Sequence, residues 1–470
     1  MSHLISPSIS QPTSDAAPIQ NPANSTIYEQ PNAPAPVLPR RWSATTRLAF
    51  RFAFCYFLIY ALCCGNATLW IIFPFHIGEH INNFVTWPFQ QSSQWIGQHL
   101  FHLTGVAGTP HGGGSGDRAI DWIAIGVMLA LAILATLLWT AIDELLKSPR
   151  PAAYHRLFFW FRLILRVTLG IAMLFYGMDK LFPLQMAPPS LAVLNEPLGN
   201  TSPMTMLWTL IGMNPVYEMI CGAAEVTAGI LILFRRTSLL GTLLTAFLAT
   251  NIVLYNFCFD VPVKIYAAHL LFMSLVLLAP DLRTLFNFFL LHRPTPPTER
   301  WLRPAWRYGL RFETVCAVII LLLAAVPFAI GAGHAYAHQL SNAHHPPPLT
   351  GQWHLDTATK PFVTGDASPM ADIFFEPTGR AMIRSSDGVL WRAGADINDK
   401  RHTLQLFCTG REDAPTYAMT QPDPSHLTLT PTGKDAAKDG TLTLTRVPLP
   451  THYPLLDRGF HFVNEWGLER

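Results

Sequence analysis

The sequence predicts an α-helical polytopic membrane bundle of about seven transmembrane helices, followed by a small all-β domain outside the cytoplasm. The first observation is composition: of 470 residues, 50% are hydrophobic and only 13% are charged, and the mean hydropathy is +0.26. Soluble globular proteins carry about 25% charged residues. The second is a series of long apolar segments before residue 334, and the third is a change to short alternating runs after residue 350.

The net charge and the composition of the N-terminal residues restrict the class of protein further. The net charge of +2 comes from 32 basic and 30 acidic residues, so we expect no nucleic-acid partner. Residues 1–45 are rich in Pro, Ser, Asn and Gln and contain no apolar run. They cannot bury a core, and we expect a disordered cytoplasmic tail rather than a signal peptide.

Seven segments are long and apolar enough to cross a bilayer, whose core of about 30 Å needs about 20 helical residues. They are Leu48–Phe73, Ala119–Ile142, Leu157–Met178, Pro215–Phe234, Ser238–Phe257, Val263–Pro280 and Phe312–Ala332. The first two, with a long outer loop, occupy residues 46–156. A core of four helices occupies 157–290, and a cytoplasmic loop and the seventh helix occupy 291–333. The aromatic segment Trp87–Leu103 is too polar to span and is predicted to be an interfacial helix.

The basic residues set the orientation, because cytoplasmic loops carry an excess of Lys and Arg. The N-terminal flank and the loops after the second, fourth and sixth segments are basic, while the alternate loops carry only Arg118, Lys180 and Lys264. The N-terminus is therefore predicted to be cytoplasmic and the C-terminal domain to be outside.

Two charges lie within apolar segments, where each needs a reason. Arg166 and Glu225 are each about nine residues from the predicted cytoplasmic edge, on successive antiparallel helices. Equal depth predicts an ion pair between them. A structural clamp and a functional site are both open interpretations of such a pair.

Two further charges extend this pattern towards the outer surface. Lys180 shares a helix face with Arg166, and Glu218 lies seven residues before Glu225 on one face of the next helix. We call these four residues the polar seam and take them as the candidate catalytic residues. For Lys180 and Glu218 the alternative is a charge that simply reaches interfacial water.

Other polar residues are predicted to face the same outer side and are the candidate substrate-binding residues. They are Asp117, Asn256, Asp260, Lys264, His461 and Glu465. The simpler alternative for Asp260 and Lys264 is that they neutralise each other in a tight turn.

A weak metal motif occurs once. His76, Glu79 and His80 match the H-x-x-E-H pattern of inverted zincins, in which two histidines share a helix face. Pro74 and Gly78 disfavour a helix here, so a chance match is the favoured interpretation and no metal is predicted.

The C-terminal region divides into a linker, 334–350, with four histidines and three prolines, and a β-rich domain, 351–470. Strands are predicted at Ala371–Glu376, Ala381–Ser385, Leu390–Ala393, Thr403–Cys408, His426–Thr430 and Thr441–Thr445. Turn dipeptides such as Asp387-Gly388 separate them. This pattern predicts a small antiparallel β-sandwich or barrel.

The region from about Phe159 to Phe289 resembles the DoxX-like family of bacterial membrane proteins. The matching residues are Arg166 to Gly170, Tyr176-Gly177-Met178-Asp179-Lys180-Leu181, Gly222-x-x-Glu225-x-x-x-Gly229, Arg235-Arg236-Thr237 and Asn256 to Lys264. The resemblance implies a four-helix core in a bacterial cytoplasmic (inner) membrane with the β-domain in the periplasm. Some such proteins take part in quinone-linked redox chemistry, which would make a quinone the cofactor and a redox protein or lipid-soluble molecule the partner.

Two functions from different classes follow. In the first, the protein is a quinone- or lipid-linked oxidoreductase component with a polar pocket in the outer half of the bundle. In the second, it is a non-enzymatic membrane protein that binds or moves a lipid or small solute, or acts as a scaffold. A membrane metallohydrolase is a weaker third hypothesis. The sequence contains no haem motif, flavin fingerprint or C-x-x-C pair that would supply a redox centre.

Overall fold

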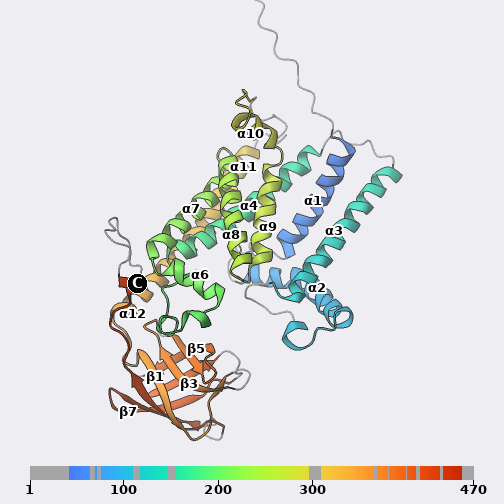
Figure 1. Cartoon of the computed structure of the whole chain (residues 1–470). Coiled ribbons are helices and arrows are strands. Elements are labelled where there is room, and N and C mark those ends of the chain that lie inside the picture. The colour runs from blue at the N-terminus through green and yellow to red at the C-terminus, as the bar shows by residue number, and fades with distance from the viewer. Residues whose placement is uncertain are drawn as a thin grey trace, which may run out of the picture.

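A helical bundle carries a β-barrel at one end (Figure 1). The computed structural model describes residues 42–63, 69–70, 73, 76–108, 117–146, 154–295, 309–364, 368–378, 380–398, 400–408, 413–433 and 438–457. We call the side of the bundle next to the barrel the barrel side, where α4 ends and α7 begins. The opposite side, where α1 begins and α7 ends, is the far side.

A helix covers most of each predicted apolar segment, and further helices that the sequence did not predict lie between them. The helices are α1 (Ala44–Cys63), α2 (Ile77–Leu100), α3 (Ala119–Leu145), α4 (His155–Leu181), α5 (Leu191–Leu194), α6 (Pro203–Gly212), α7 (Pro215–Leu233), α8 (Ser238–Cys258), α9 (Lys264–Leu278), α10 (Leu282–Phe289), α11 (Gly309–Ile320) and α12 (Val326–His344). Within the described residues, six helices are long and apolar enough to cross a membrane. The pair α9 and α10, bent by 79°, makes up to seven if it is one span. These helices confirm the prediction that the chain contains several helices of membrane-spanning length and composition.

Glycines bring α4 and α7 into close contact. A Cβ atom at Gly222 of α7 would lie 2.3 Å from the Leu181 backbone nitrogen and 2.6 Å from the Gly177 carbonyl oxygen. About two turns further along α7, a Cβ at Gly229 would lie 2.9 Å from the Gly170 carbonyl oxygen. Small residues at this spacing allow helix backbones to approach, as is usual for helix pairs in membranes. They also fix the register of α4 against α7.

The last helix of the bundle is longer than the sequence predicted. Residues Arg311–His344 form one apolar helix that contains a π-helical turn at Leu321–Ala325. Pro327 follows this turn, and a proline inside a helix removes a backbone N–H donor and disturbs the regular bonding. Helix α12 continues to His344, so most of the predicted linker 334–350 is helical. The reason is its alanine-rich sequence, which favours helix until Pro346.

The predicted interfacial segment is helical but longer than expected. Helix α2 begins at Ile77 and lies across the barrel-side ends of α1 and α3 (Figure 1). Its aromatic residues Phe84, Trp87 and Trp95 are exposed. Its position at a membrane interface stays a prediction.

The C-terminal domain is an antiparallel barrel, one of the two expected architectures. Its strands are β1 (Gly351–Ala358), β2 (Val363–Thr364), β3 (Ser368–Phe375), β4 (Arg380–Ser385), β5 (Leu390–Asn398), β6 (Thr403–Cys408), β7 (Thr416–Asp423), β8 (His426–Pro431) and β9 (Leu442–Val447). Eight strands close the barrel, because β1 pairs with both β9 and β3, and the short β2 pairs only with β3. A short helix, α13 (Pro454–Asp457), follows.

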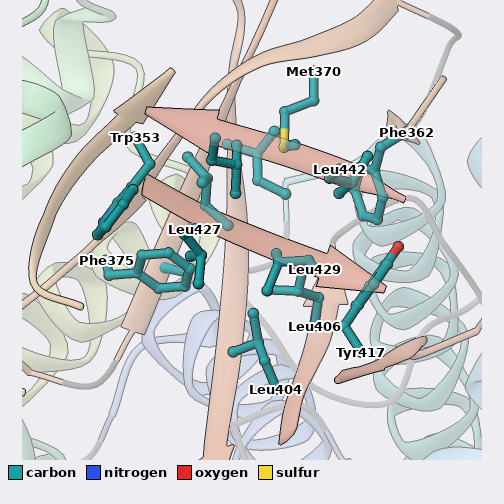
Figure 2. Packing of buried hydrophobic residues seen from close by; sticks show 14 of the residues in the cluster. Trp353, Phe362, Met370, Phe375, Leu404, Leu406, Tyr417, Leu427, Leu429 and Leu442 are labelled. Carbon is teal, nitrogen blue, oxygen red and sulfur yellow. The ribbon is translucent and has the colours of Figure 1, made fainter. Parts of the chain in front are cut away.

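The barrel interior is filled with apolar side chains (Figure 2). Trp353, Leu404, Leu406, Leu427 and Leu429 are fully buried and converge from three different strands, β1, β6 and β8. Eight-stranded barrels have an interior just wide enough for side chains to fill or for one small ligand. This barrel is of the filled kind.

The barrel is attached to the segment between α4 and α6. The Glu376 carboxylate, just after β3, accepts hydrogen bonds from the backbone N–H groups of Leu191 (2.8 Å) and Ala192 (3.2 Å). On β4, Arg384 forms an ion pair with Glu196 at 3.1 Å. Burial raises the pKa of the Glu376 carboxyl, although the two N–H groups act in the opposite direction.

Candidate functional site

Two residues of the polar seam meet in the bundle. The Lys180 ammonium of α4 donates to both carboxylate oxygens of Glu225 on α7, at 2.8 and 2.7 Å. Both side chains are 5% exposed. The Tyr176 ring lies 5.9 Å from the ammonium nitrogen. The close contact of α4 with α7 at Gly177 places the two charges opposite each other.

The predicted ion pair between Arg166 and Glu225 is wrong. Arg166 instead binds Glu313 of α11 at 2.8 Å. A Cβ at Gly177 would lie 2.9 Å from Glu225 Cβ, and Arg166 precedes Gly177 by about three helical turns, roughly 16 Å. The prediction assumed that the far-side ends of α4 and α7 are level, whereas α4 extends well beyond the end of α7.

Arg166 also bonds the end of α7. Its guanidinium donates to the carbonyl oxygens of Ile232 (3.0 Å) and Leu233 (2.7 Å), which lack partners within the helix. Glu313 receives a second cation, Arg235, at 3.3 Å. This network joins α4, α7 and α11 on the far side of the bundle. Sequence reasoning missed Glu313, although an acidic residue at the start of an apolar span was a visible signal.

Glu218 lies apart from the Lys180 pair. It is fully buried, and its carboxylate accepts the backbone N–H of Met186 at 2.8 Å. Met186 belongs to the segment that follows α4. The four residues of the seam therefore form three separate arrangements, and only Lys180 and Glu225 contact each other.

Four candidate substrate-binding residues lie around the start of α9. Asp117 accepts the backbone N–H groups of Lys264 (2.5 Å) and Ile265 (2.8 Å), and so caps α9 from the start of α3. Asn256 donates to the Val263 carbonyl oxygen at 3.2 Å. Lys264 also pairs with Asp260 at 2.8 Å. Each of these contacts stabilises the turn between α8 and α9 and its attachment to α3.

The remaining candidate residues do not lie among those at the start of α9. His461 and Glu465 lie outside the described residues. His76 precedes α2 and has a left-handed backbone, with φ of 61°, so it does not share a helical face with His80. His76 and Glu79 form an exposed pair at 3.2 Å. In the part of the chain that the structure describes, no three His, Cys, Asp or Glu residues are grouped as a metal would require.

A buried histidine was missed by the sequence interpretation. His269 of α9 stacks on the Tyr60 ring of α1, with centroids 3.8 Å apart and planes 5° apart. Its Nδ1 lies 2.7 Å from the Ile265 carbonyl oxygen and so must donate, while Nε2 lies 2.7 Å from the Tyr56 hydroxyl. In the neutral imidazole Nε2 would then accept a hydrogen bond from the Tyr56 hydroxyl. The available signal was a histidine within an apolar span.

Comparison with known proteins gives little information on function. No family model matches the chain, and no solved structure matches it. A stretch of 85 residues, 18% of the chain, is 39% identical to the uncharacterized protein YwoB of Bacillus subtilis (strain 168). The chain spans about half the length of that relative, 55%. The resemblance to DoxX-like proteins stays a prediction.

Proposed function

We propose that this chain is a non-enzymatic, multi-pass protein of a bacterial cytoplasmic membrane that holds its barrel outside the cytoplasm as a docking module. The observation that carries the proposal is the filled barrel interior (Figure 2). Side chains fill the interior of this barrel, so a partner would contact its outer surface. Glu376 and Arg384 attach that barrel to the bundle by bonds to the segment after α4, which suits a fixed module.

The ion pairs of the bundle support the same proposal. Lys180 satisfies both oxygens of Glu225, and Arg166 bonds Glu313 and two helix carbonyls. A buried ion pair whose groups bond to each other contributes to helix register and specificity. In this proposal the seam is structural. The proposed orientation of the chain in the membrane follows the distribution of basic residues among its loops.

Site-specific photo-crosslinking in intact cells tests the docking function. A photoreactive amino acid replaces Phe407, 47% exposed on β6, and in the control it replaces Leu137, 58% exposed on α3. We expect one discrete protein adduct from the barrel position, while the helix position gives lipid adducts only. Identical adduct patterns from both positions would contradict docking by the barrel.

A quinone-linked redox component is the second candidate. Its specific observation is that Lys180 and Glu225 bring a cation and an acid together inside the bundle. An ammonium group binds a quinone carbonyl, and a carboxyl group can supply its proton. The resemblance to DoxX-like proteins supports this candidate as well.

Quinone extraction distinguishes the two candidates. Protein purified with its native lipid is extracted and its quinone content is measured, beside a Lys180→Met/Glu225→Met variant. Stoichiometric quinone that the double variant loses would favour the redox function over docking. A quinone content equal to that of bulk lipid in both proteins would exclude it.

A further inference from the structure

Helix α10 turns sharply out of the bundle on the far side, at the end most distant from the barrel (Figure 1). Its axis is bent by 79° from the axis of α9. The eight residues Leu282–Phe289 therefore advance only about 2 Å along the direction of α9. A helix at this angle runs along the surface of a membrane that α9 crosses, and not through it.

The corner between α9 and α10 is fixed by contacts with the bundle. Asp281 lies in this corner, is buried, and forms an ion pair with Arg162 of α4 at 3.8 Å. The Asp281 backbone N–H donates to the Leu278 carbonyl oxygen at 2.8 Å. Its own carbonyl oxygen accepts the N–H of Leu285, in the first turn of α10, at 2.9 Å. The direction of α10 is therefore set by the packing of α4 and α9.

Helix α10 has an apolar face that the described part of the chain does not cover. Leu282, Phe286 and Phe289 share this face at positions i, i+4 and i+7, and they are 54%, 52% and 60% exposed. None of the residues of α10 is buried. Arg283 and Asn287 lie on the other side of the helix. Such a helix is typical of a membrane interface, where one face enters the acyl chains and the other contacts headgroups.

Positive charge remains uncompensated around α10. Three exposed arginines form no ion pair within the described residues, and they are Arg283 of α10, Arg293 four residues after its end and Arg236 just before α8. Helix α8 packs antiparallel on α9, so Arg236 lies at the same end of the bundle as α10. Carboxylates of this side already have a cationic partner, namely Asp143 with Arg51, Asp281 with Arg162 and Glu313 with Arg166. Anionic groups outside the protein would complement the free arginines.

We infer that α10 lies in the headgroup region of the membrane and gathers anionic phospholipids, such as phosphatidylglycerol, at its end of the bundle. The face of Leu282, Phe286 and Phe289 packs on acyl chains, while Arg283 and Arg293 contact lipid phosphates. Zwitterionic lipids carry the same phosphate, but their own cation competes with the arginines, so net charge decides which lipid accumulates. This inference is independent of the proposed docking function, since the barrel lies at the opposite end of the bundle.

Photo-crosslinking in vesicles of known composition tests the inference. A photoreactive phenylalanine analogue replaces Phe286 in the full-length protein, which is reconstituted into equal parts of phosphatidylglycerol and phosphatidylcholine with identical acyl chains. Mass spectrometry of the digested protein identifies the lipid adducts. We expect phosphatidylglycerol to exceed phosphatidylcholine about threefold among them. The same analogue at Phe247, 73% exposed in the middle of α8, should give the two lipids in equal amounts.

Substitutions then assign the preference to the arginines. In the protein labelled at position 286, Arg283→Gln/Arg293→Gln should bring the two lipids to equal amounts, whereas Arg283→Lys/Arg293→Lys keeps both charges and should keep the preference. The matched control is Arg380→Gln/Arg392→Gln, which removes two exposed arginines of the barrel and should change nothing. Salt at about 1 M should also reduce the preference, because the Debye length falls to about 3 Å.

Four results would overturn the inference. Equal amounts of the two lipids at position 286 of the otherwise natural chain show that anionic headgroups are not preferred. A preference that survives Arg283→Gln/Arg293→Gln shows that other charges attract the lipid. Crosslinks to a second copy of the chain show that α10 forms an interface between subunits. Lipid adducts at position 247 but none at position 286 show that the face of α10 does not reach the membrane.

Discussion

The bundle and the barrel bury different kinds of side chain. The barrel interior consists of aliphatic and aromatic residues that meet from all sides (Figure 2). The bundle buries Lys180, Glu225, Arg166 and Glu313 at its helix contacts. The hydrophobic effect drives packing in water, but in lipid it gives helices no preference for each other over acyl chains. Glycine contacts and ion pairs therefore have a larger role in the bundle than in the barrel.

The largest expected effect is the loss of the α4–α7 contact. Gly222→Val introduces a side chain whose Cβ would lie 2.3 Å from the Leu181 nitrogen and 2.6 Å from a backbone oxygen. Backbone atoms cannot move aside cheaply, so we expect a loss of more than about 4 kcal/mol of stability or no folded protein. Size-exclusion chromatography and thermal unfolding measure this.

The matched control is Gly126→Val on α3, where a Cβ would have no atom within 4 Å. It should yield monodisperse protein. If Gly222→Val also folds normally, close glycine packing does not hold the bundle, and the contrast between bundle and barrel fails.

The next effect concerns the buried ion pair. Lys180→Met alone leaves the Glu225 carboxylate buried without its cation, and we expect a loss of about 3–5 kcal/mol. The double variant Lys180→Met/Glu225→Met removes both charges and should lie within about 1 kcal/mol of the natural chain or be more stable. Unfolding free energies in a double-mutant cycle measure the coupling. A double variant as unstable as the single one would show that the pair does more than compensate charge.

In the barrel, a comparable loss of stability should come from a cavity in the core and not from an unpaired charge. Leu429 is fully buried in the barrel interior, and Leu429→Ala should cost about 2–5 kcal/mol. Hydrogen exchange of the β8 amides reports the opening of the barrel. The control is Val389→Ala, at a residue 47% exposed, which should change stability by less than about 0.5 kcal/mol. Faster exchange in the bundle helices would show that the two parts unfold together.

The sequence predicted the elements better than their contacts. Apolar length alone located the spans, because a bilayer requires long apolar helices. It could not exclude the Arg166–Glu225 pair, since the register that Gly170 and Gly222 impose on α4 and α7 places Arg166 at the end of α7 instead. Register is a tertiary property, and an error of a few residues exchanges one partner for another.

The same limit applies to two strands of the barrel and to the predicted role of Asp117. The first strand, β1, and β7 were missed because their alternation is interrupted by polar residues, although the barrel buries Trp353 and Tyr417 from them. Asp117 was predicted to face a substrate, yet its carboxylate caps α9 across a long sequence separation. An aspartate between two segments has the same appearance in either role.

The smallest effect is expected at the junction between the two regions, and it depends on pH. Burial raises the pKa of Glu376 above its ordinary value of 4.5, so the folded state prefers the protonated carboxyl. The junction should therefore be most stable below pH 4.5 and lose stability as the pH rises through the raised pKa. Hydrogen exchange of the Leu191 and Ala192 amides, corrected for intrinsic rates, measures this, and Glu376→Gln should remove the dependence.

An exposed carboxylate of the barrel provides a control of opposite sign. Hydrogen bonds from Ser385 and Ser368 lower the pKa of Asp387 below its ordinary value of 3.8, so its contribution is present above that pH and is lost as the pH falls through the lowered pKa. Asp387→Asn should therefore speed local exchange of the β4–β5 turn at pH values above the lowered pKa, where the carboxylate contributes, make no difference in acid, and leave the junction unchanged. If Glu376→Gln keeps the full pH dependence of the Leu191 and Ala192 amides, another titrating group controls the attachment of the barrel to the bundle.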